Sequence, residues 1–142
     1  MEWRGVLAIH ISMMIFGGAL AFAASVHNPV SLDQDFTLRM NQSANIQAAG
    51  LTVTFRSVLE DSRCPTDVVC IWQGNARVVL DIADEKGEIS SIKLTRGAEP
   101  RIALAKRYKL RFVSLAPESY EGVSIPASDY TITLRLVGKR GD

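Results

Sequence analysis

Two cysteines separated by five residues are the side chains best placed to react with each other in this sequence. Cys64 and Cys70 are the only cysteines among 142 residues. In an oxidising compartment, two thiols this close in sequence favour a disulfide bond. Loop closure over the seven residues from Cys64 to Cys70 gives about 2.4 kcal/mol of stabilisation. Such a bond would hold one loop in shape, while the fold itself would survive its loss.

Other thiol and metal chemistry fits this stretch poorly. The Cys-x-x-Cys spacing that lowers a thiol pKa is absent. A zinc site would need further nitrogen or sulfur ligands, and His27 is the only histidine beyond the apolar N-terminal segment. Calcium binding by Glu60, Asp61 and Asp67 would lack the alternating carboxylate spacing of a dedicated site. We therefore expect no cofactor and no metal site.

The surrounding segment, residues 60–75, is rich in residues that hold irregular backbone in one shape. A rigid exposed loop carrying Arg63, Asp67 and Trp72 would form a recognition element. Alternatively, Trp72 covers the disulfide or the edge of the core, and Gly74 allows a close approach of the chain. Because large aromatic side chains usually belong to the core, the second interpretation is favoured for Trp72.

A basic stripe is the second candidate binding surface. Arg107, Lys109 and Arg111 alternate along one expected strand, so they share a face that could bind anionic glycans or lipid headgroups. The same charges could simply keep an edge strand soluble. The whole chain has 16 Lys and Arg against 15 Asp and Glu, a formal net charge of +1. This balance favours the solubility role and gives no reason to expect nucleic-acid binding.

Enzymatic chemistry has little support in the residue types. A nucleophile–base arrangement usually needs a histidine, and the acidic residues fall mostly in expected turns, where solvated charges are common. We therefore favour a non-catalytic binding or accessory domain, with an envelope protein or a glycan as its partner. A carboxylate- or metal-dependent envelope enzyme and a structural component of a cell-envelope assembly remain as alternatives.

The elements that would position these residues are β-strands, because apolar and polar residues alternate with period two along most of the chain. Seven or eight short strands predict an all-β fold, an antiparallel β-sandwich of immunoglobulin-like architecture. Ser57 and Val58 break the alternation, which suggests a bulge or a second covering layer. The expected inward-facing sets are Phe36, Leu38 and Met40; Leu51, Val53, Phe55 and Leu59; Ala76, Val78, Leu80 and Ile82; Tyr108, Leu110 and Phe112; and Tyr130, Ile132, Leu134 and Leu136.

Shorter signals complete the strand prediction. Residues 84–87, Asp-Glu-Lys-Gly, read as a hairpin turn with a glycine where a positive φ is needed. Two further short strands are expected at Asn45–Ala48 and Arg101–Leu104. The irregular segments 60–75 and 116–129 are the longest loops, and loops of this kind often carry binding surfaces.

The N-terminal segment resembles a secretory signal peptide. Arg4 precedes an apolar stretch of 17 residues from Val6 to Phe22, and Ala21-Phe22-Ala23 supplies small residues for cleavage after Ala23. The stretch is shorter than the roughly 20 residues that span a bilayer, although an uncleaved anchor remains the alternative. We expect residues 1–23 to be removed and residues 24–142 to form one domain, periplasmic or secreted, with no stable membrane span.

The cysteine segment also carries a resemblance. It reads Asp-Ser-Arg-Cys-Pro, four residues, then Cys-Ile-Trp-Gln-Gly-Asn-Ala-Arg-Val, and Asp-Tyr-Thr-Ile-Thr-Leu follows near the end. This is similar to a group of exported bacterial proteins and lipoproteins without an assigned activity that share a Cys-Pro-x4-Cys-x-Trp-x-Gly stretch. The match covers residues 60–82 and, loosely, the last strand. It implies an exported bacterial β-domain and no catalytic residues, and the sequence departs from the lipoprotein members by lacking a lipid-bearing cysteine.

Overall fold

The structure is a computed structural model that describes residues 29–97 and 108–138. Within these ranges the chain forms seven strands and two short 3-10 helices. No helix in them has the length and apolar character needed to cross a bilayer. The elements are β1 (Asp35–Arg39), β2 (Ser43–Ile46), η1 (Gln47–Ala49), β3 (Leu51–Asp61), β4 (Ala76–Asp84), β5 (Ile89–Thr95), β6 (Tyr108–Ala116), η2 (Ala127–Asp129) and β7 (Thr131–Gly138).

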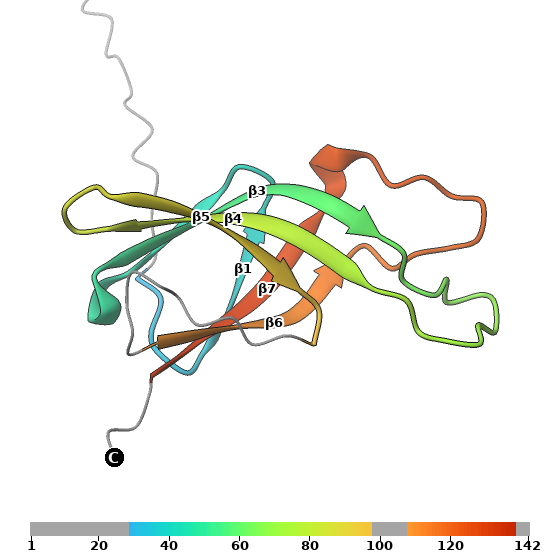
Figure 1. The fold of residues 1–142 in the computed structure, drawn as a ribbon, viewed down its shortest axis with the longest axis horizontal. Coiled ribbons are helices and arrows are strands. Elements are labelled where there is room, and N and C mark those ends of the chain that lie inside the picture. The colour runs from blue at the N-terminus through green and yellow to red at the C-terminus, as the bar shows by residue number, and fades with distance from the viewer. Residues whose placement is uncertain (1–28, 98–107, 139–142) are drawn as a thin grey trace, which may run out of the picture.

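The strands form two antiparallel sheets (Figure 1). One sheet has three strands in the order β1-β7-β6, and the other has four strands in the order β2-β3-β4-β5. Buried side chains of both sheets belong to one hydrophobic cluster. The all-β prediction and the antiparallel pairing are therefore confirmed. The β3–β4 and β6–β7 connections leave the sheets at the same end (Figure 1).

The period-two pattern explains which side chains enter the core. In β4 the residues Ala76, Val78, Leu80 and Ile82 are all fully buried, while Arg77 between them is exposed. The same alternation gives the buried residues of β1 and β7, as predicted. Every second side chain of a strand points to the same face. Apolar residues at alternate positions are therefore enough to give a strand one buried face.

The expected bulge in β3 is present, and it corrects one predicted core residue. The pairing of β3 with β4 shifts register between Phe55 and Ser57 and again between Val58 and Glu60. An extra residue reverses the facing of those that follow. Val58 consequently packs against the core, whereas Leu59, predicted to face inward, is 48% exposed.

The shorter predictions have mixed outcomes. The hairpin between β4 and β5 turns at Gly87, whose φ is 80°, as expected. The short strand predicted at Asn45–Ala48 lies earlier, at Ser43–Ile46, because residues 47–49 turn into η1. The leader, the predicted strand Arg101–Leu104 and Arg107 lie outside the described residues.

Candidate functional site

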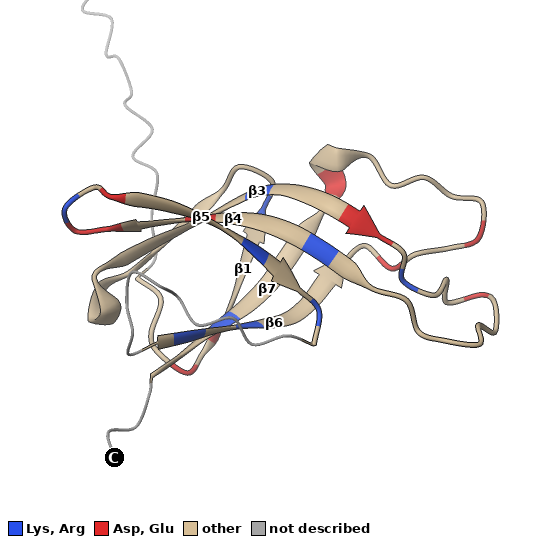
Figure 2. Cartoon of the chain, in the orientation of Figure 1, with Lys and Arg blue, Asp and Glu red and all other residues tan. Residues whose placement is uncertain are grey.

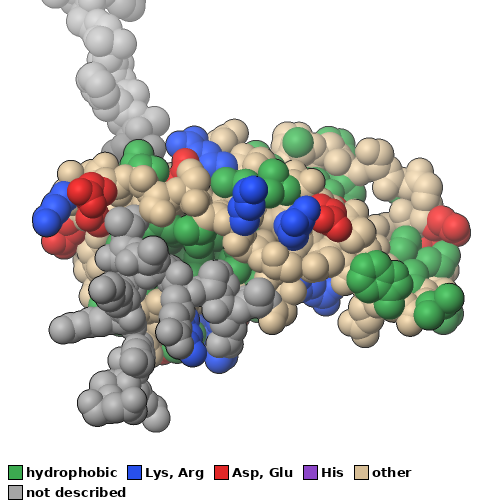
Figure 3. Space-filling view, in the orientation of Figure 1, with side chains coloured by type: hydrophobic (Ala, Val, Ile, Leu, Met, Phe, Trp, Pro, Cys, Tyr) green, Lys and Arg blue, Asp and Glu red, His purple; other side chains and the backbone are tan. Residues whose placement is uncertain are grey.

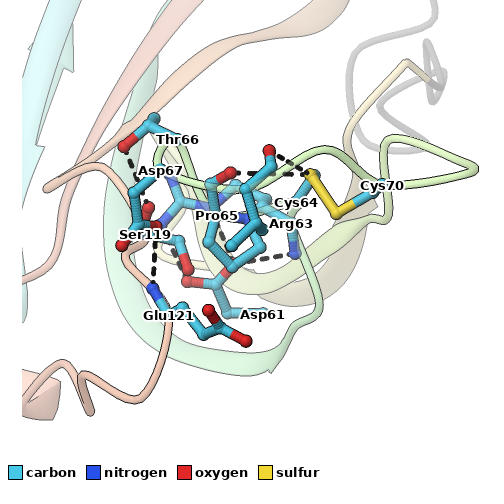
Figure 4. The surroundings of a disulfide bond; sticks show 10 residues. Asp61, Arg63, Cys64, Pro65, Thr66, Asp67, Cys70, Ser119 and Glu121 are labelled. Atoms are coloured by element: carbon cyan, nitrogen blue, oxygen red, sulfur yellow. Dashed lines mark hydrogen bonds and ion pairs between the residues drawn. A yellow bond between two sulfur atoms is a disulfide. The ribbon is translucent and has the colours of Figure 1, made fainter.

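The predicted disulfide is present. Cys64 and Cys70 are joined with a Cα–Cα distance of 6.0 Å. They lie in the connection between β3 and β4, residues 62–75, which we call the disulfide loop (Figure 4).

The disulfide loop begins and ends as a narrow stem. The backbone N–H of Ser62 donates to the carbonyl of Asn75 at 2.8 Å, and the N–H of Cys64 donates to the carbonyl of Gln73 at 2.9 Å. Gly74 has a φ of 65°, and a Cβ at this position would lie 1.6 Å from the Ser62 carbonyl oxygen. Only glycine fits such a close approach, so Gly74 allows the two sides of the stem to pair.

Arg63 has a different position from the one predicted. The sequence predicts an exposed position, but Arg63 is only 8% exposed, at the base of the disulfide loop. Its Nε and Nη2 donate to the two carboxylate oxygens of Asp61 at 2.7 and 2.8 Å. Its Nη1 and Nη2 also donate to the backbone carbonyls of Leu115 and Pro117. Two of these hydrogen bonds hold the end of β3, and the other two hold the end of β6 and the residue after it. Arg63 therefore anchors the disulfide loop to β6.

Tyr130, the residue before β7, completes this anchor. Its hydroxyl donates to Asp61 Oδ2 at 2.9 Å. Burial alone would raise the pKa of Asp61, but hydrogen bonds from Arg63 and Tyr130 outweigh it and lower that pKa below its usual range. Burial and the neighbouring carboxylate raise the pKa of Tyr130 to about 12. The cluster therefore holds an ionised Asp61 and a neutral tyrosine at ordinary pH.

A second pair of contacts joins the disulfide loop to residues 117–130, which we call the β6–β7 loop. The N–H of Thr66 donates to the carbonyl of Ser119 at 2.8 Å. Asp67 is exposed, but its Oδ1 accepts the backbone N–H of Glu121 at 2.9 Å. Asp67 therefore positions the two loops against each other (Figure 4).

The far end of the disulfide loop presents apolar side chains to solvent. Val69 and Ile71 are fully exposed, and Trp72 is 71% exposed. Figure 3 shows these apolar side chains as a group at the end of the molecule. The prediction that Trp72 covers the edge of the core is therefore wrong, because most of its side chain is exposed. The alternative that it covers the disulfide stays a prediction.

A groove lies beside Trp72. It has a volume of about 450 Å³, within the range of small-ligand sites, and it separates the disulfide loop from β6. Trp72 and Gln73 line it from the loop, Ser114 lines it from β6, and Glu118 lines it from the β6–β7 loop. Arg96, just after β5, completes its polar lining.

The two described residues of the basic stripe, Lys109 and Arg111, are separate from this groove. Lys109 and Arg111 lie on β6 opposite Val137 and Arg135 of β7, and both make interactions of their own. Neither lines the groove. Figure 2 shows these basic positions on β6 away from the disulfide loop. The described residues of the two surfaces singled out in the sequence therefore do not form one site.

Sequence reasoning missed most of the groove. The residue Glu118 falls in a loop that the sequence singled out, but nothing in the spacing of Gln73, Arg96 and Ser114 indicates that they meet. In the part of the chain that the structure describes, no three His, Cys, Asp or Glu side chains are grouped so that they could hold a metal ion.

No known protein family, curated protein or solved structure matches the chain in comparisons of sequence and fold.

Proposed function

We propose that the chain is an exported, non-catalytic binding domain, an immunoglobulin-like β-sandwich released from a leader of residues 1–23. Its binding surface is the disulfide loop together with the adjoining groove. The periplasm or the cell exterior is the compartment that fits it, because a short-range disulfide persists where thiols are oxidised. The resemblance of residues 60–82 to exported bacterial proteins agrees with this location.

The observation that carries the proposal is the contrast between the base and the tip of the disulfide loop. At the base, Arg63 is buried and makes four hydrogen bonds. At the tip, Val69, Ile71 and Trp72 are exposed. A fixed loop loses little conformational entropy on binding, and an exposed tryptophan is a frequent anchor of interfaces. An apolar tip on a rigid base is therefore suited to recognition.

The test compares Trp72→Ala with a matched control, Ile89→Ala. Ile89 is 66% exposed and begins β5 beside the β4–β5 hairpin, away from the disulfide loop (Figure 1). Each immobilised protein is incubated with solubilised cell envelope from the producing organism, and bound protein, glycan and lipid are quantified. We expect Trp72→Ala to lose the bound component and Ile89→Ala to keep it. Both should change the free energy of unfolding by about 0.5 kcal/mol or less, as exposed substitutions do.

Two results would overturn the proposal. The first is capture by Trp72→Ala equal to that of the unchanged protein. The second is a decrease of about 3 to 5 kcal/mol in the free energy of unfolding of Trp72→Ala. A decrease of that size is typical of a buried aromatic residue and would show that Trp72 belongs to the core.

A further inference from the structure

We propose that the groove beside Trp72 binds an uncharged saccharide. This inference rests on the proposed function and assigns a ligand class to its binding surface. Three features support it: the charges that line the groove, the hydrogen-bonding groups of its lining, and the interrupted backbone edge of β6.

The charges around the groove favour an uncharged ligand. The guanidinium of Arg63 is neutralised by the carboxylate of Asp61 in a two-point ion pair. Among the residues that the structure describes, the other charged side chains that line the groove are Arg96 and Glu118, which have opposite signs. A single carboxylate is a poor cation site, and the same carboxylate would repel an anion. Neither kind of ion is therefore favoured.

The remaining groups suit a ligand with one apolar face and many hydroxyls. Among the described residues, Trp72 is the only aromatic one that lines the groove, and its exposed ring offers a flat apolar surface. Gln73 and Ser114 can each donate and accept hydrogen bonds, Arg96 donates and Glu118 accepts. A pyranose ring has C–H groups on its faces and hydroxyls at its rim, so it can use both kinds of contact at once.

A polypeptide added as an extra strand fits less well. The β6 strand is at the edge of its sheet, but the carbonyl of Leu115 is already taken by Arg63. A register shift between Phe112 and Ser114 also interrupts the regular spacing of the edge. Strand addition needs an open row of backbone groups, and beside the groove this row is broken.

A comparison of Ile71 with Trp72 distinguishes saccharide binding in the groove from insertion of the apolar loop tip into a lipid surface. Ile71 is as exposed as a side chain can be, yet it does not line the groove, whereas Trp72 next to it does. The affinity for a ligand in the groove should depend on Trp72 and should not depend on Ile71. A lipid surface that receives the tip should depend on both.

The experiment measures tryptophan fluorescence of the full chain with Trp3→Phe, so that Trp72 is the only indole. The probes are uncharged tetrasaccharides of glucose, mannose, galactose and N-acetylglucosamine, and vesicles of phosphatidylcholine. We expect at least one tetrasaccharide to change the emission in a saturable way. In calorimetry, Trp72→Ala should weaken its binding about tenfold or more, the equivalent of one aromatic stacking contact. Ile71→Ala should change the affinity less than twofold, and Glu118→Gln should weaken binding several-fold without unfolding the protein.

Three results would overturn the inference. One is the absence of any response to the tetrasaccharides at concentrations up to about 10 mM, beyond which affinity carries little specificity. Another is an equal loss of binding in Ile71→Ala and Trp72→Ala. The third is a blue-shifted emission with vesicles only. If Trp72-dependent capture from the envelope persists while every saccharide fails, the ligand class is wrong and the binding function stands.

Discussion

Replacing Arg63 with alanine tests whether the buried ion pair anchors the disulfide loop. The side chains of Arg63 and Asp61 are 7% and 10% exposed. The substitution removes four hydrogen bonds, leaves the carboxylate with only the tyrosine hydroxyl as a side-chain partner, and frees two backbone carbonyls. Breaking a buried pair by removing one partner costs about 3 to 5 kcal/mol. We expect a loss of that size in the free energy of unfolding.

The matched control is Arg56→Ala, and the assay is urea denaturation followed by circular dichroism. Arg56 pairs with Asp81 on the surface, and its side chain is half exposed. Exposed pairs contribute about 0 to 1 kcal/mol, so the control should unfold near the unchanged protein. If Arg63→Ala costs no more than Arg56→Ala, the anchor described above does not hold the loop.

The same pair has a predictable dependence on acid. Because the pKa of Asp61 is lowered from its usual 3.8 in the folded protein, its ionised form stabilises the fold. That contribution is present above the unfolded pKa of about 3.9 and is lost as the pH falls through the lower folded pKa. Stability of the unchanged protein should therefore decline below about pH 4. In Arg63→Ala this part of the decline should be smaller, and an unchanged acid profile would contradict the assignment.

Three further predictions concern residues around the loop. The double substitution Cys64→Ser and Cys70→Ser should lower the unfolding free energy by about 2 kcal/mol and leave the far-ultraviolet circular dichroism unchanged; loss of the β-sheet signal would show that the fold needs the bond. Gly74→Ala should cost clearly more than Gly122→Ala, because both have positive φ but only the first places a Cβ against a backbone carbonyl oxygen; equal melting temperatures would refute the close approach. Tyr130 has a pKa raised to about 12, so stability should fall between about pH 10 and pH 12 as the unfolded chain ionises first, and Tyr130→Phe should lack this part of the fall in alkaline denaturation.

The strands could be predicted because their information is local. In β7 the residues Ile132, Leu134 and Leu136 are buried and the residues between them are not. This arrangement follows from the period of the backbone alone. The turn at Gly87 is local in the same way, since one positive φ decides it.

Leu59 shows where local information ends. Its place in the alternation predicted burial, but the register shift between Phe55 and Ser57 reverses the facing of the residues after it, and Leu59 points outward. The position of a bulge depends on which residues of the partner strand must be matched. A pattern along one strand indicates that a bulge is needed without fixing the facing of each residue after it.

The site was harder to predict because its contacts are distant in sequence. Arg63 can be buried because, besides Asp61, the carbonyls of Leu115 and Pro117, 52 and 54 residues away, accept its hydrogen bonds. Without such partners a charged side chain belongs on the surface and Trp72 in the core. The disulfide could be predicted because its two partners are six positions apart, whereas the groove is assembled from four separate segments.

The strand order also sets a constraint on the timing of synthesis. β2, β3, β4 and β5 are neighbours in both sequence and space, so they can pair as each one emerges from the ribosome or from a translocation channel. β7 lies between β1 and β6 and, among the strands that the structure describes, is the only one hydrogen-bonded to either of them. β1, the first strand synthesised, therefore cannot pair with β7 until the last strand has been made. A nascent chain stopped before Thr131 would expose two unpaired strand edges, which promote aggregation and attract proteases.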